Sequence, residues 1–361
     1  MPDRLGKLVD AINRVGIQNI ALLNRMTGIP VETIRYTIKK RFPELGLFVG
    51  LHIDYDHLGL ERQFAVIEFA QDAQSYAPEL LKRLAKLAFL TYCSREVLKP
   101  IYLANFGVPA SQKREFRTFI DKLVQEKIIN SIRIERLEWM RNLALRSEYY
   151  DYNEQEWSID WSRVALLKEP PPTPPETMEP WEKPEIDLTD LLLIKELELQ
   201  AWRSIAEIAD KLQLNDRTLR WHFNNHVGPL IKAYYVHRLS EGSKKLTKIV
   251  GLVHEFHKLQ KDELGKLRRI FGNFPFTWKE GGREDGYYRA VSTVPVEHLV
   301  ESMHFLNSNL QKNVVSWYVY TLDLSFSYSY TIPYENFRDK EGWSFDAEKT
   351  INSILEIKTK K

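Results

Sequence analysis

The feature that most constrains this 361-residue chain is an internal repeat. Short segments of its first half recur in its second half, in the same order and always 185 or 186 positions later. Three such matches along one chain indicate a duplicated unit of about 165 residues. We therefore expect two similar units rather than one continuous fold. The matches are TIRYTI at 33–38 with TLRWHF at 218–223, VP at 108–109 with VP at 294–295, and EWSID at 156–160 with GWSFD at 342–346.

A proline-rich stretch separates the two halves. The segment EPPPTPPETMEPWEKPE at 169–185 holds seven of the chain's 17 prolines. Proline lacks an amide hydrogen and fixes its backbone angle, so such a stretch favours extended polyproline II over helix or sheet. At about 3.1 Å per residue, 15 such residues span roughly 45 Å, enough to join two globular units. The sequence predicts an acidic linker over 169–186.

The composition indicates a soluble protein and leaves nucleic acid open as a partner. Hydrophobic residues make up 43% of the chain, charged residues 28%, and the mean hydropathy is −0.38. No apolar run reaches 18 residues and no apolar signal core opens the chain, so we expect a cytoplasmic protein without a membrane partner. The single cysteine, Cys93, excludes an internal disulfide framework. A net charge of +2 neither requires nor excludes DNA, because a DNA footprint needs locally clustered charge.

Each half begins with two short helices joined by a tight turn. Gly28 and Pro30 fall between them in the first half, and Asn215 is placed to cap the second helix of the second half. Apolar residues recur at helical spacing, which predicts one buried face on each helix. This is the pattern of a helix-turn-helix, whose second helix can enter the major groove of DNA. The inward residues are Ile20, Leu23, Met26, Ile34, Ile38 and Phe42 in the first half and Ile205, Ile208, Ala209, Leu212, Leu219 and Phe223 in the second.

The outward side of the second helix in each pair carries residues suited to DNA. Arg35 and Arg220 stand at matching positions, and arginine reads guanine edges, whereas Asn224 suits adenine. Threonine, lysine and the remaining arginine suit phosphates. The alternative to DNA binding is that these residues form an ordinary solvent-exposed face and that the helix pair serves only to pack against the rest of the protein. The predicted DNA-binding residues are Thr33, Arg35, Tyr36, Lys39, Lys40, Arg217, Thr218, Arg220, Trp221 and Asn224.

The rest of each half alternates between strand and helix patterns. In the first half the order is β-α-β-β-α-β, the ferredoxin-like arrangement, with a last strand at SIRIERLEWM, 131–140. An aromatic extension follows in each half, at 147–161 and 330–346, and we expect each to pack across its own domain or its partner. The predicted fold is α+β, with two tandem copies of a winged helix-turn-helix followed by a ferredoxin-like domain. The predicted domains are a helix-turn-helix at 1–46, a ferredoxin-like domain with its extension at 47–168, the linker at 169–186, a second helix-turn-helix at 187–242 and a second ferredoxin-like domain with its extension at 243–361.

The first helix pair followed by IDYDHLGLERQFAVIEF, 53–69, resembles the Lrp/AsnC group of prokaryotic feast-famine regulators, and LNDRTLRWHF, 214–223, is similar to the start of their recognition helix. The resemblance implies binding to double-stranded DNA, self-association through the ferredoxin-like domains and, commonly, an amino-acid effector. The turn that usually helps to hold the effector is not visible where REVLKPIYLANFG stands, 95–107. The second half lacks the LGL step and carries WKEGGREDGYYR, 278–289, interpreted as a loop in place of a strand connection, with GGREDG, 281–286, as a surface hairpin.

A search for an enzyme finds no assembled catalytic site. His222 and His226 are spaced so that one face of a helix could present both to a metal, but no third ligand is evident nearby. His254 falls in a strand pattern, and Cys93 is interpreted as a buried small residue. The sequence therefore predicts no enzymatic activity, no cofactor and no metal.

The function predicted from the sequence is a transcriptional regulator whose two unequal recognition helices read an imperfect palindrome in the major groove. One alternative is a protein-interaction factor, for example one that meets the transcription machinery, or an architectural DNA binder. Another comes through the same architecture, because some of its members decarboxylate haem precursors. On that interpretation His52, His57 and His254 are the residues to suspect.

Overall fold

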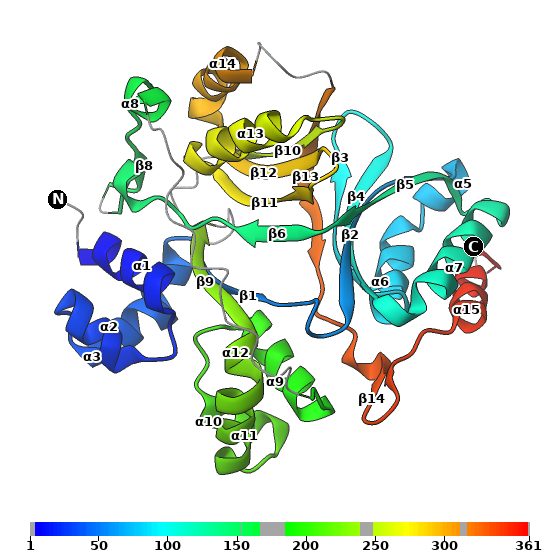
Figure 1. Ribbon diagram of the computed structural model, residues 1–361, viewed down its shortest axis with the longest axis horizontal. Coiled ribbons are helices and arrows are strands. Elements are labelled where there is room, and N and C mark those ends of the chain that lie inside the picture. Colours follow the sequence, from blue (N-terminus) through cyan, green and yellow to red (C-terminus); the bar gives the residue numbers. More distant parts are fainter. Residues whose placement is uncertain (1–3, 153, 167–184, 239–247, 311–315, 360–361) are drawn as a thin grey trace. The chain divides into compact units, whose positions relative to one another are not determined.

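The computed structural model describes residues 4–152, 154–166, 185–238, 248–310 and 316–359 (Figure 1). The chain forms two compact units, each built from several stretches of sequence. The first unit comprises 1–53, 139–181 and 196–319, and the second comprises 54–138, 182–195 and 320–361. The predicted linker lies, over 169–184, outside the described residues. None of the described helices is both long and apolar enough to cross a bilayer.

The second unit contains the β-α-β-β-α-β order predicted for 60–137. Its strands pair antiparallel in the order β5-β2-β4-β3, and residues 322–329 of β13 (Trp317–Ser329) pair with β3. Two strands that are neighbours in the chain, β3 and β4, are also neighbours in the sheet. The elements are β2 (Leu60–Phe69), α5 (Gln71–Gln74), α6 (Ala77–Leu87), β3 (Leu90–Glu96), β4 (Ile101–Pro109), a 3-10 turn at Ala110–Gln112, α7 (Lys113–Gln125), β5 (Ile129–Leu137), a 3-10 turn at Tyr334–Asn336, β14 (Phe337–Arg338), β15 (Gly342–Trp343) and α15 (Ala347–Thr359).

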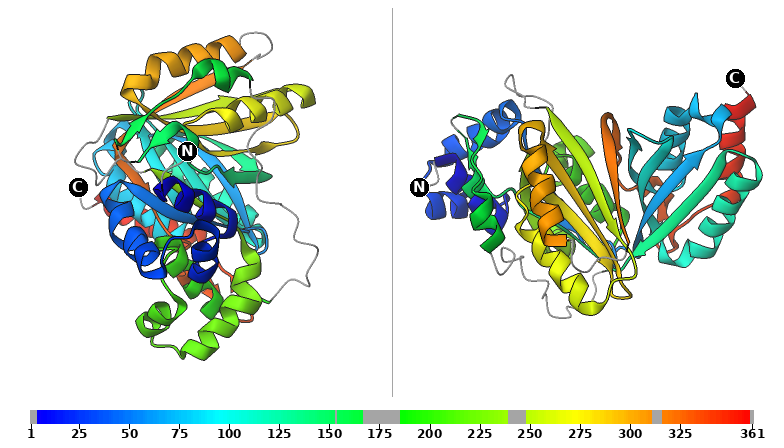
Figure 2. Two further views of the ribbon diagram at one scale, coloured as in Figure 1. Left: turned by 90° about the vertical axis from the view of Figure 1, so that its left-hand side faces the viewer. Right: turned by 90° about the horizontal axis from the view of Figure 1, so that it is seen from above.

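Helices α6, α7 and α15 form the core of this unit with one face of its sheet, and Figure 2 shows α15, in red, beside α7. Each helix turns a stripe of apolar residues inward, with Leu84, Phe119 and Ile354 all at most 2% exposed. Burying a side chain of this size contributes about 1.5–3 kcal/mol. Apolar spacing of about 3.6 residues is thus sufficient to account for how these helices lie on the sheet.

The first unit contains two groups of short helices, two larger antiparallel sheets and the small two-stranded sheet of β7 (Tyr150–Asp151) and β8 (Glu156–Trp157). Strands β1 and β9 form one antiparallel pair, and the second sheet includes β10, β12, β11 and β6 in that order. Helices α13 and α14 pack on one face of the second sheet around Phe256 and Phe271. The first group of helices comprises α1 (Arg4–Val15), α2 (Ile20–Thr27), α3 (Val31–Tyr36), a π-helical segment at Thr37–Arg41 and α4 (Phe42–Glu44); the second comprises α10 (Ile205–Leu212), α11 (Asp216–His222), a π-helical segment at Phe223–Val227 and α12 (Gly228–Leu230).

The remaining elements of this unit are β1 (Leu47–Ile53), β6 (Trp139–Asn142), a 3-10 turn at Ser147–Tyr149, β7 (Tyr150–Asp151), β8 (Glu156–Trp157), α8 (Trp161–Leu166), β9 (Ile231–Arg238), β10 (Ile249–Phe256), α13 (Lys261–Asn273), β11 (Thr277–Arg283), β12 (Tyr287–Pro295), a 3-10 turn at Val296–His298 and α14 (Leu299–Leu310). Helix α9 (Leu188–Leu199) is continuous across the division between the units, which falls between Lys195 and Glu196.

Two predictions about strands are wrong in detail. The segment 131–140 is not one strand: β5 ends at Leu137 in the second unit, and β6 begins at Trp139 and pairs with β11 in the first. The segment 278–289 is not a loop in place of a strand connection, because most of it belongs to strands β11 and β12, and the hairpin predicted at 281–286 is confirmed as their connection. Glycine makes this possible, since a Cβ on Gly282 would lie 2.4 Å from the carbonyl oxygen of Tyr287.

Each aromatic extension packs against residues from the other half of the sequence. The first extension, after β5 and β6, lies in the first unit, where Trp157 meets Phe276 edge-on at 4.9 Å. The second extension, after β13, lies in the second unit, where Phe345 packs on Phe119 at 5.5 Å. There Trp343 Nε1 donates a hydrogen bond to the Leu58 carbonyl at 2.6 Å. The extensions therefore pack against folded domains, as predicted. Of the two surfaces predicted for each extension, its own domain or the partner domain, the structure shows the partner domain in both cases.

Candidate nucleic-acid interface

The first candidate recognition helix is α3 with its π-helical continuation. Asn19 caps α2 by accepting the Leu22 amide at 2.9 Å, and Gly28 ends α2 in the left-handed region with φ of 69°. Ile34 and Ile38 are 0% and 3% exposed, so the predicted inward face is confirmed there. Phe42 and Leu23 are also buried, Ile20 is half-buried, and Met26 is 42% exposed. The inward placement of Met26 is therefore wrong, because this eight-residue helix buries a narrower stripe than its spacing suggests.

The outward side of this helix is open to solvent. All five residues predicted there to bind DNA are exposed, and Tyr36 keeps 58% of its surface accessible. Arg35 Nη1 lies 2.6 Å from Glu32 Oε1, one turn earlier on the same helix. Both side chains are more than half exposed, and ion pairs of this kind contribute about 0–1 kcal/mol. The ion pair therefore orients the Arg35 side chain, and little free energy is needed to break it. The residues are Thr33, Arg35, Tyr36, Lys39 and Lys40.

The second candidate recognition helix, α11, is built in the same way. The side chain of Asn215 accepts the amides of Arg217 and Thr218 at 2.9 and 3.2 Å, which confirms the predicted cap. Arg220 Nε lies 2.9 Å from Asp216 Oδ2, so this arginine also pairs with an acid earlier on its own helix. All the residues predicted to bind DNA are exposed: Arg217, Thr218, Arg220, Trp221 and Asn224. The predicted inward residues Ile205, Ile208, Ala209 and Leu219 are buried, while Leu212 and Phe223 are half-buried.

Both helices continue into a π-helical segment of five residues at equivalent places, Thr37–Arg41 and Phe223–Val227. The π-helix is rare and is found mostly as short insertions, frequently at functional sites. Each segment leads into a short helix with a proline at its start, α4 or α12. Spacing arguments based on 3.6 residues per turn cannot predict such segments.

A two-stranded ladder joins the strands that follow the two helix groups. Strands β1 and β9 pair antiparallel from Leu47 opposite Arg238 to Ile53 opposite Ile231. Gly50 lies opposite Tyr235 in this ladder, and a Cβ there would fall 2.5 Å from the Tyr235 ring. The two helix groups are therefore held by one small sheet within the first unit.

Direct contacts also link the two helix groups. Gln18 Nε2 donates to the Ala201 carbonyl at 2.7 Å. Lys39 Nζ lies 2.8 Å from Glu207 Oε1 and 5.1 Å from the centre of the Trp202 ring. The hydrogen bond from Lys39 is the largest of the effects that lower the pKa of Glu207 to about 2. Lys39, predicted to contact DNA, is thus oriented by the neighbouring helix group while its side chain stays 43% exposed.

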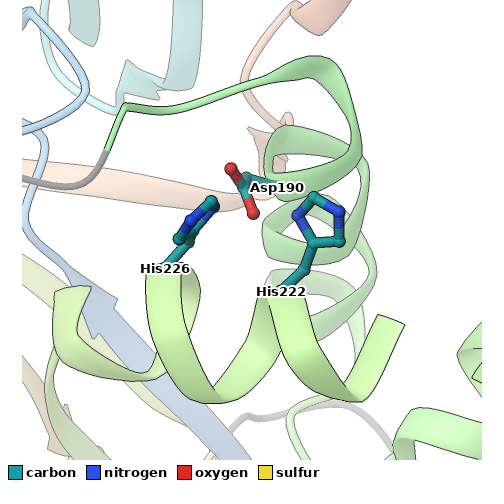
Figure 3. Close-up of side chains that lie close together, drawn as sticks. All are labelled: Asp190, His222 and His226. Atoms are coloured by element: carbon teal, nitrogen blue, oxygen red, sulfur yellow. The ribbon is translucent and has the colours of Figure 1, made fainter. Parts of the chain in front are cut away.

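Two histidines on α11 and its π-helical continuation lie side by side in the first unit. The ring centres of His222 and His226 are 5.4 Å apart, and Figure 3 shows both side chains. His222 is 8% exposed and His226 is half-buried. The sequence prediction that one helical face presents both rings is therefore confirmed.

The other histidines and the cysteine are placed as follows. His254 is 0% exposed, and burial lowers its pKa to about 3. His57 Nδ1 lies 2.7 Å from Asp54 Oδ2. His52 Nδ1 is 3.3 Å from the Asn142 amide nitrogen. Cys93 is fully buried and its pKa is raised to about 12 by desolvation, so its interpretation as a buried small residue is confirmed.

Comparison with solved structures shows full-length fold similarity to an enzyme. Two structures of the siroheme decarboxylase NirDL, one in co-complex with an iron-uroporphyrin III analogue, match this chain with a TM-score of 0.52 and 9% identity. The match covers 98% of this chain and 100% of that chain. AsnC from E. coli matches over 38% of this chain and 93% of its own, with a TM-score of 0.31 and 17% identity. A Pyrococcus furiosus regulator of the AsnC family matches over 38% of this chain and 91% of its own, with a TM-score of 0.31 and 18% identity.

Neither a family model nor a curated relative matches the sequence. The structural comparison corrects one prediction. The sequence predicted a protein without enzymatic activity, and this is overturned because the full-length fold match is to a decarboxylase. At 9% identity the likeness establishes the fold alone, a mixed α/β architecture with antiparallel sheet.

Proposed function

We propose that this chain is a double-stranded DNA-binding regulator that presents α3 and α11 as two recognition helices. The observation that carries the proposal is the β1–β9 ladder, which holds both helix groups within the first unit. An ordinary helix-turn-helix protein needs two chains to present two such helices. Here one chain supplies both, as tandem copies of one unit would.

The arginines at matching positions are the proposed base-reading residues. Arg35 and Arg220 are each held by an exposed acid on the same helix, in pairs worth at most about 1 kcal/mol. A bidentate contact with guanine contributes about 1–3 kcal/mol of discrimination. Each arginine therefore gains free energy when it leaves its acidic partner and binds guanine. Before DNA binds, the acidic partner holds the arginine side chain in place on the helix surface.

The two helices differ in charge, so the two half-sites are proposed to be unequal. The first carries Arg35 and, after three uncharged residues, the run Lys39, Lys40 and Arg41, whereas the second has two arginines and then Asn224 and Asn225. The preferred DNA is an imperfect palindrome with half-sites about 34 Å, or a multiple of that, apart. The lysine-rich helix supplies more phosphate contacts and thus more of the salt dependence.

The test is retention of sheared genomic DNA by the purified protein at about 150 mM salt, followed by sequencing. A two-part motif is the expected result. On an oligonucleotide with that motif, Arg35→Ala and Arg220→Ala should each weaken binding by about 5–150-fold, corresponding to 1–3 kcal/mol. Arg117→Ala is the matched control, because Arg117 is an exposed arginine on α7 in the other unit.

Each other outcome of this test identifies a different function. Retention without any motif would indicate an architectural DNA binder, and unchanged affinity in both arginine variants would remove the recognition-helix assignment. No retention at all would favour a protein-interaction role, for example with the transcription machinery.

The second candidate function is tetrapyrrole decarboxylation, which the full-length fold match with NirDL favours. Of the three histidines suspected from the sequence, His57 fits a proton-transfer role best. Its side chain is 33% exposed and Asp54 lies 2.7 Å from its Nδ1, so Asp54 fixes the ring and leaves Nε2 to exchange a proton. His254 is enclosed by aromatic rings and is 0% exposed. Titration with iron-uroporphyrin III, followed by absorbance and by mass spectrometry for loss of carbon dioxide, tests this candidate; an unchanged spectrum and mass would reject it.

A further inference from the structure

Two exposed aromatic side chains occupy matching positions in the two candidate recognition helices. Tyr36 is 58% exposed and Trp221 is 53% exposed, and the two stand 185 positions apart in the repeat. Of the other aromatic side chains that the structure describes, only Tyr318 is exposed to a similar degree, at 53%. A single exposed aromatic residue is ordinary on a protein surface. Its recurrence at one equivalent position indicates a function that both helices share.

The surroundings of each ring are polar, so neither ring belongs to a contiguous apolar patch. A surface that binds a protein partner has an apolar centre from which charged residues are depleted. The other exposed residues of the two helical segments, 31–41 and 216–227, are instead all polar or charged. They are Glu32, Thr33, Arg35, Lys39, Lys40 and Arg41 in the first, and Asp216, Arg217, Thr218, Arg220, Asn224 and Asn225 in the second.

The major groove of DNA offers an isolated aromatic ring one apolar contact, which is the C5 methyl group of thymine. Each of the two rings directly follows the arginine proposed to read guanine, Arg35 or Arg220. Successive residues of an α-helix rise by about 1.5 Å, less than the roughly 3.4 Å between base pairs. An arginine and the aromatic residue after it therefore reach bases that are close neighbours.

We propose that Tyr36 and Trp221 determine sequence specificity, each by contacting the methyl group of one thymine near the guanine that the preceding arginine reads. This inference rests on the proposed DNA-binding function and adds a second recognised base to each half-site. Each half-site then contains a guanine with a thymine close to it in sequence.

The ring of Trp221 is supported by its neighbours on the same helical segment. It meets the rings of His222 and His226 edge-on, with 5.2 and 4.8 Å between ring centres. The carbonyl of Trp221 accepts a hydrogen bond from Asn225 Nδ2 at 2.8 Å. A ring whose position is already restricted loses less conformational freedom when it binds. Trp221 therefore offers a preformed apolar surface to the methyl group.

The test replaces each thymine of the binding motif singly by deoxyuridine, which lacks the C5 methyl group and pairs with adenine in the same way. The full-length protein is titrated with these duplexes at about 150 mM salt and followed by fluorescence anisotropy. At one position in each half-site the replacement should weaken binding by about four-fold, the effect of one buried methyl group. In Tyr36→Ala this effect should vanish in one half-site and persist in the other. In Trp221→Ala the two half-sites should exchange roles.

Two further variants separate the aromatic ring from other effects. Tyr318→Ala is the matched control, because Tyr318 is an equally exposed tyrosine on β13, outside both helices. It should respond to deoxyuridine in both half-sites, as the wild type does. Tyr36→Phe keeps the ring without its hydroxyl group and should also keep the response. Melting curves verify that each variant is folded.

The opposing outcomes are distinct. The inference is overturned if deoxyuridine has no effect at any thymine, or if its effect survives in both Tyr36→Ala and Trp221→Ala. Equal weakening on all sequences, with a loss of DNA bending measured by fluorescence energy transfer, would show that the rings are wedges between bases and would also overturn it. Binding that only Arg35→Ala and Arg220→Ala weaken overturns this inference alone. Absence of DNA binding under every condition overturns the proposed function and this inference with it, in favour of a protein partner.

Discussion

Replacement of His254 by leucine should remove a defined part of the acid sensitivity of this protein. His254 lies on β10 in the core of the first unit, 5.0 Å from Phe271 and 6.0 Å from Trp317 between ring centres. Among the described residues neither of its ring nitrogens has a hydrogen-bond partner. Burial lowers its pKa from 6.5 to about 3, because the charged ring would be enclosed by apolar groups.

The sign and the size of the effect follow from this pKa. Between pH 6.5 and pH 3 the unfolded chain binds a proton at this histidine and the folded chain does not, so stability falls as the pH falls. Each pH unit in that window lowers the free energy of unfolding by about 1.4 kcal/mol. The wild type therefore loses roughly 2 kcal/mol of stability at pH 5 relative to pH 7.5. The ring is fully buried, so solvent does not screen this effect.

Equilibrium unfolding in urea at pH 7.5 and pH 5.0 measures this loss of stability. At pH 7.5 we expect His254→Leu to be as stable as the wild type or more stable, because relief of two unpartnered nitrogens, worth about 1–3 kcal/mol, offsets a packing change of at most about 1.5 kcal/mol. At pH 5.0 the wild type should lose about 2 kcal/mol more than the variant. His304→Leu, at an exposed position, is the control and should lose as much stability between the two pH values as the wild type. Equal losses in the wild type and His254→Leu would refute the assignment of a buried neutral histidine.

Three further substitutions test the frame of the proposed interface and the packed extension. Gly50→Ala places a methyl group 2.5 Å from the Tyr235 ring; we expect a loss of about 1–3 kcal/mol from overpacking and weaker DNA binding, measured by melting and by gel shift. Asn215→Ala removes the cap of α11 and should cost about 1 kcal/mol, while Asn225→Ala, which removes only an exposed contact on the same helical segment, should cost less; similar losses would contradict the cap. Trp343→Phe leaves a backbone carbonyl in the second unit without its donor and should cost about 1–3 kcal/mol in urea unfolding, and an unchanged midpoint would show that the bond contributes nothing.

Sequence reasoning succeeded where the information is local. Asn215 was recognised as a cap because a cap needs only its own side chain and the amides two and three residues further on. Ile34 and Ile38 were placed inward because a helical stripe of apolar residues has one way to be buried. The prediction that Met26 is buried was wrong. Periodicity gives the direction in which a side chain points but not how wide the surface is that covers the helix.

The parts that could not be predicted depend on contacts distant in sequence. Strands β1 and β9 pair although they lie in opposite halves of the sequence, and no local pattern selects one as the partner of the other. The π-helical segments depart from the 3.6-residue repeat on which the prediction relied. The exchange of the aromatic extensions was left open for a similar reason, because Trp157 and Trp343 occur in matching motifs and nothing local distinguishes one docking surface from the other.

The placement of the two aromatic extensions bears on how one chain could present the two unlike helices of the proposed interface. The segment after β5 completes the core around Phe276 in the first unit, and the segment after β13 completes the core around Phe119 in the second. Each core therefore contains residues from both halves of the sequence, and neither half carries all the apolar surface that its own sheet needs to bury. Each of these two cores thus needs residues from both halves of the sequence. Helices α3 and α11 contribute to neither core, so the residues on their outward faces do not affect this packing. Arg35 with its lysine neighbours, and Arg220 beside His222, are thus free to differ at no cost to the packing, which is the condition that recognition of two unequal half-sites requires.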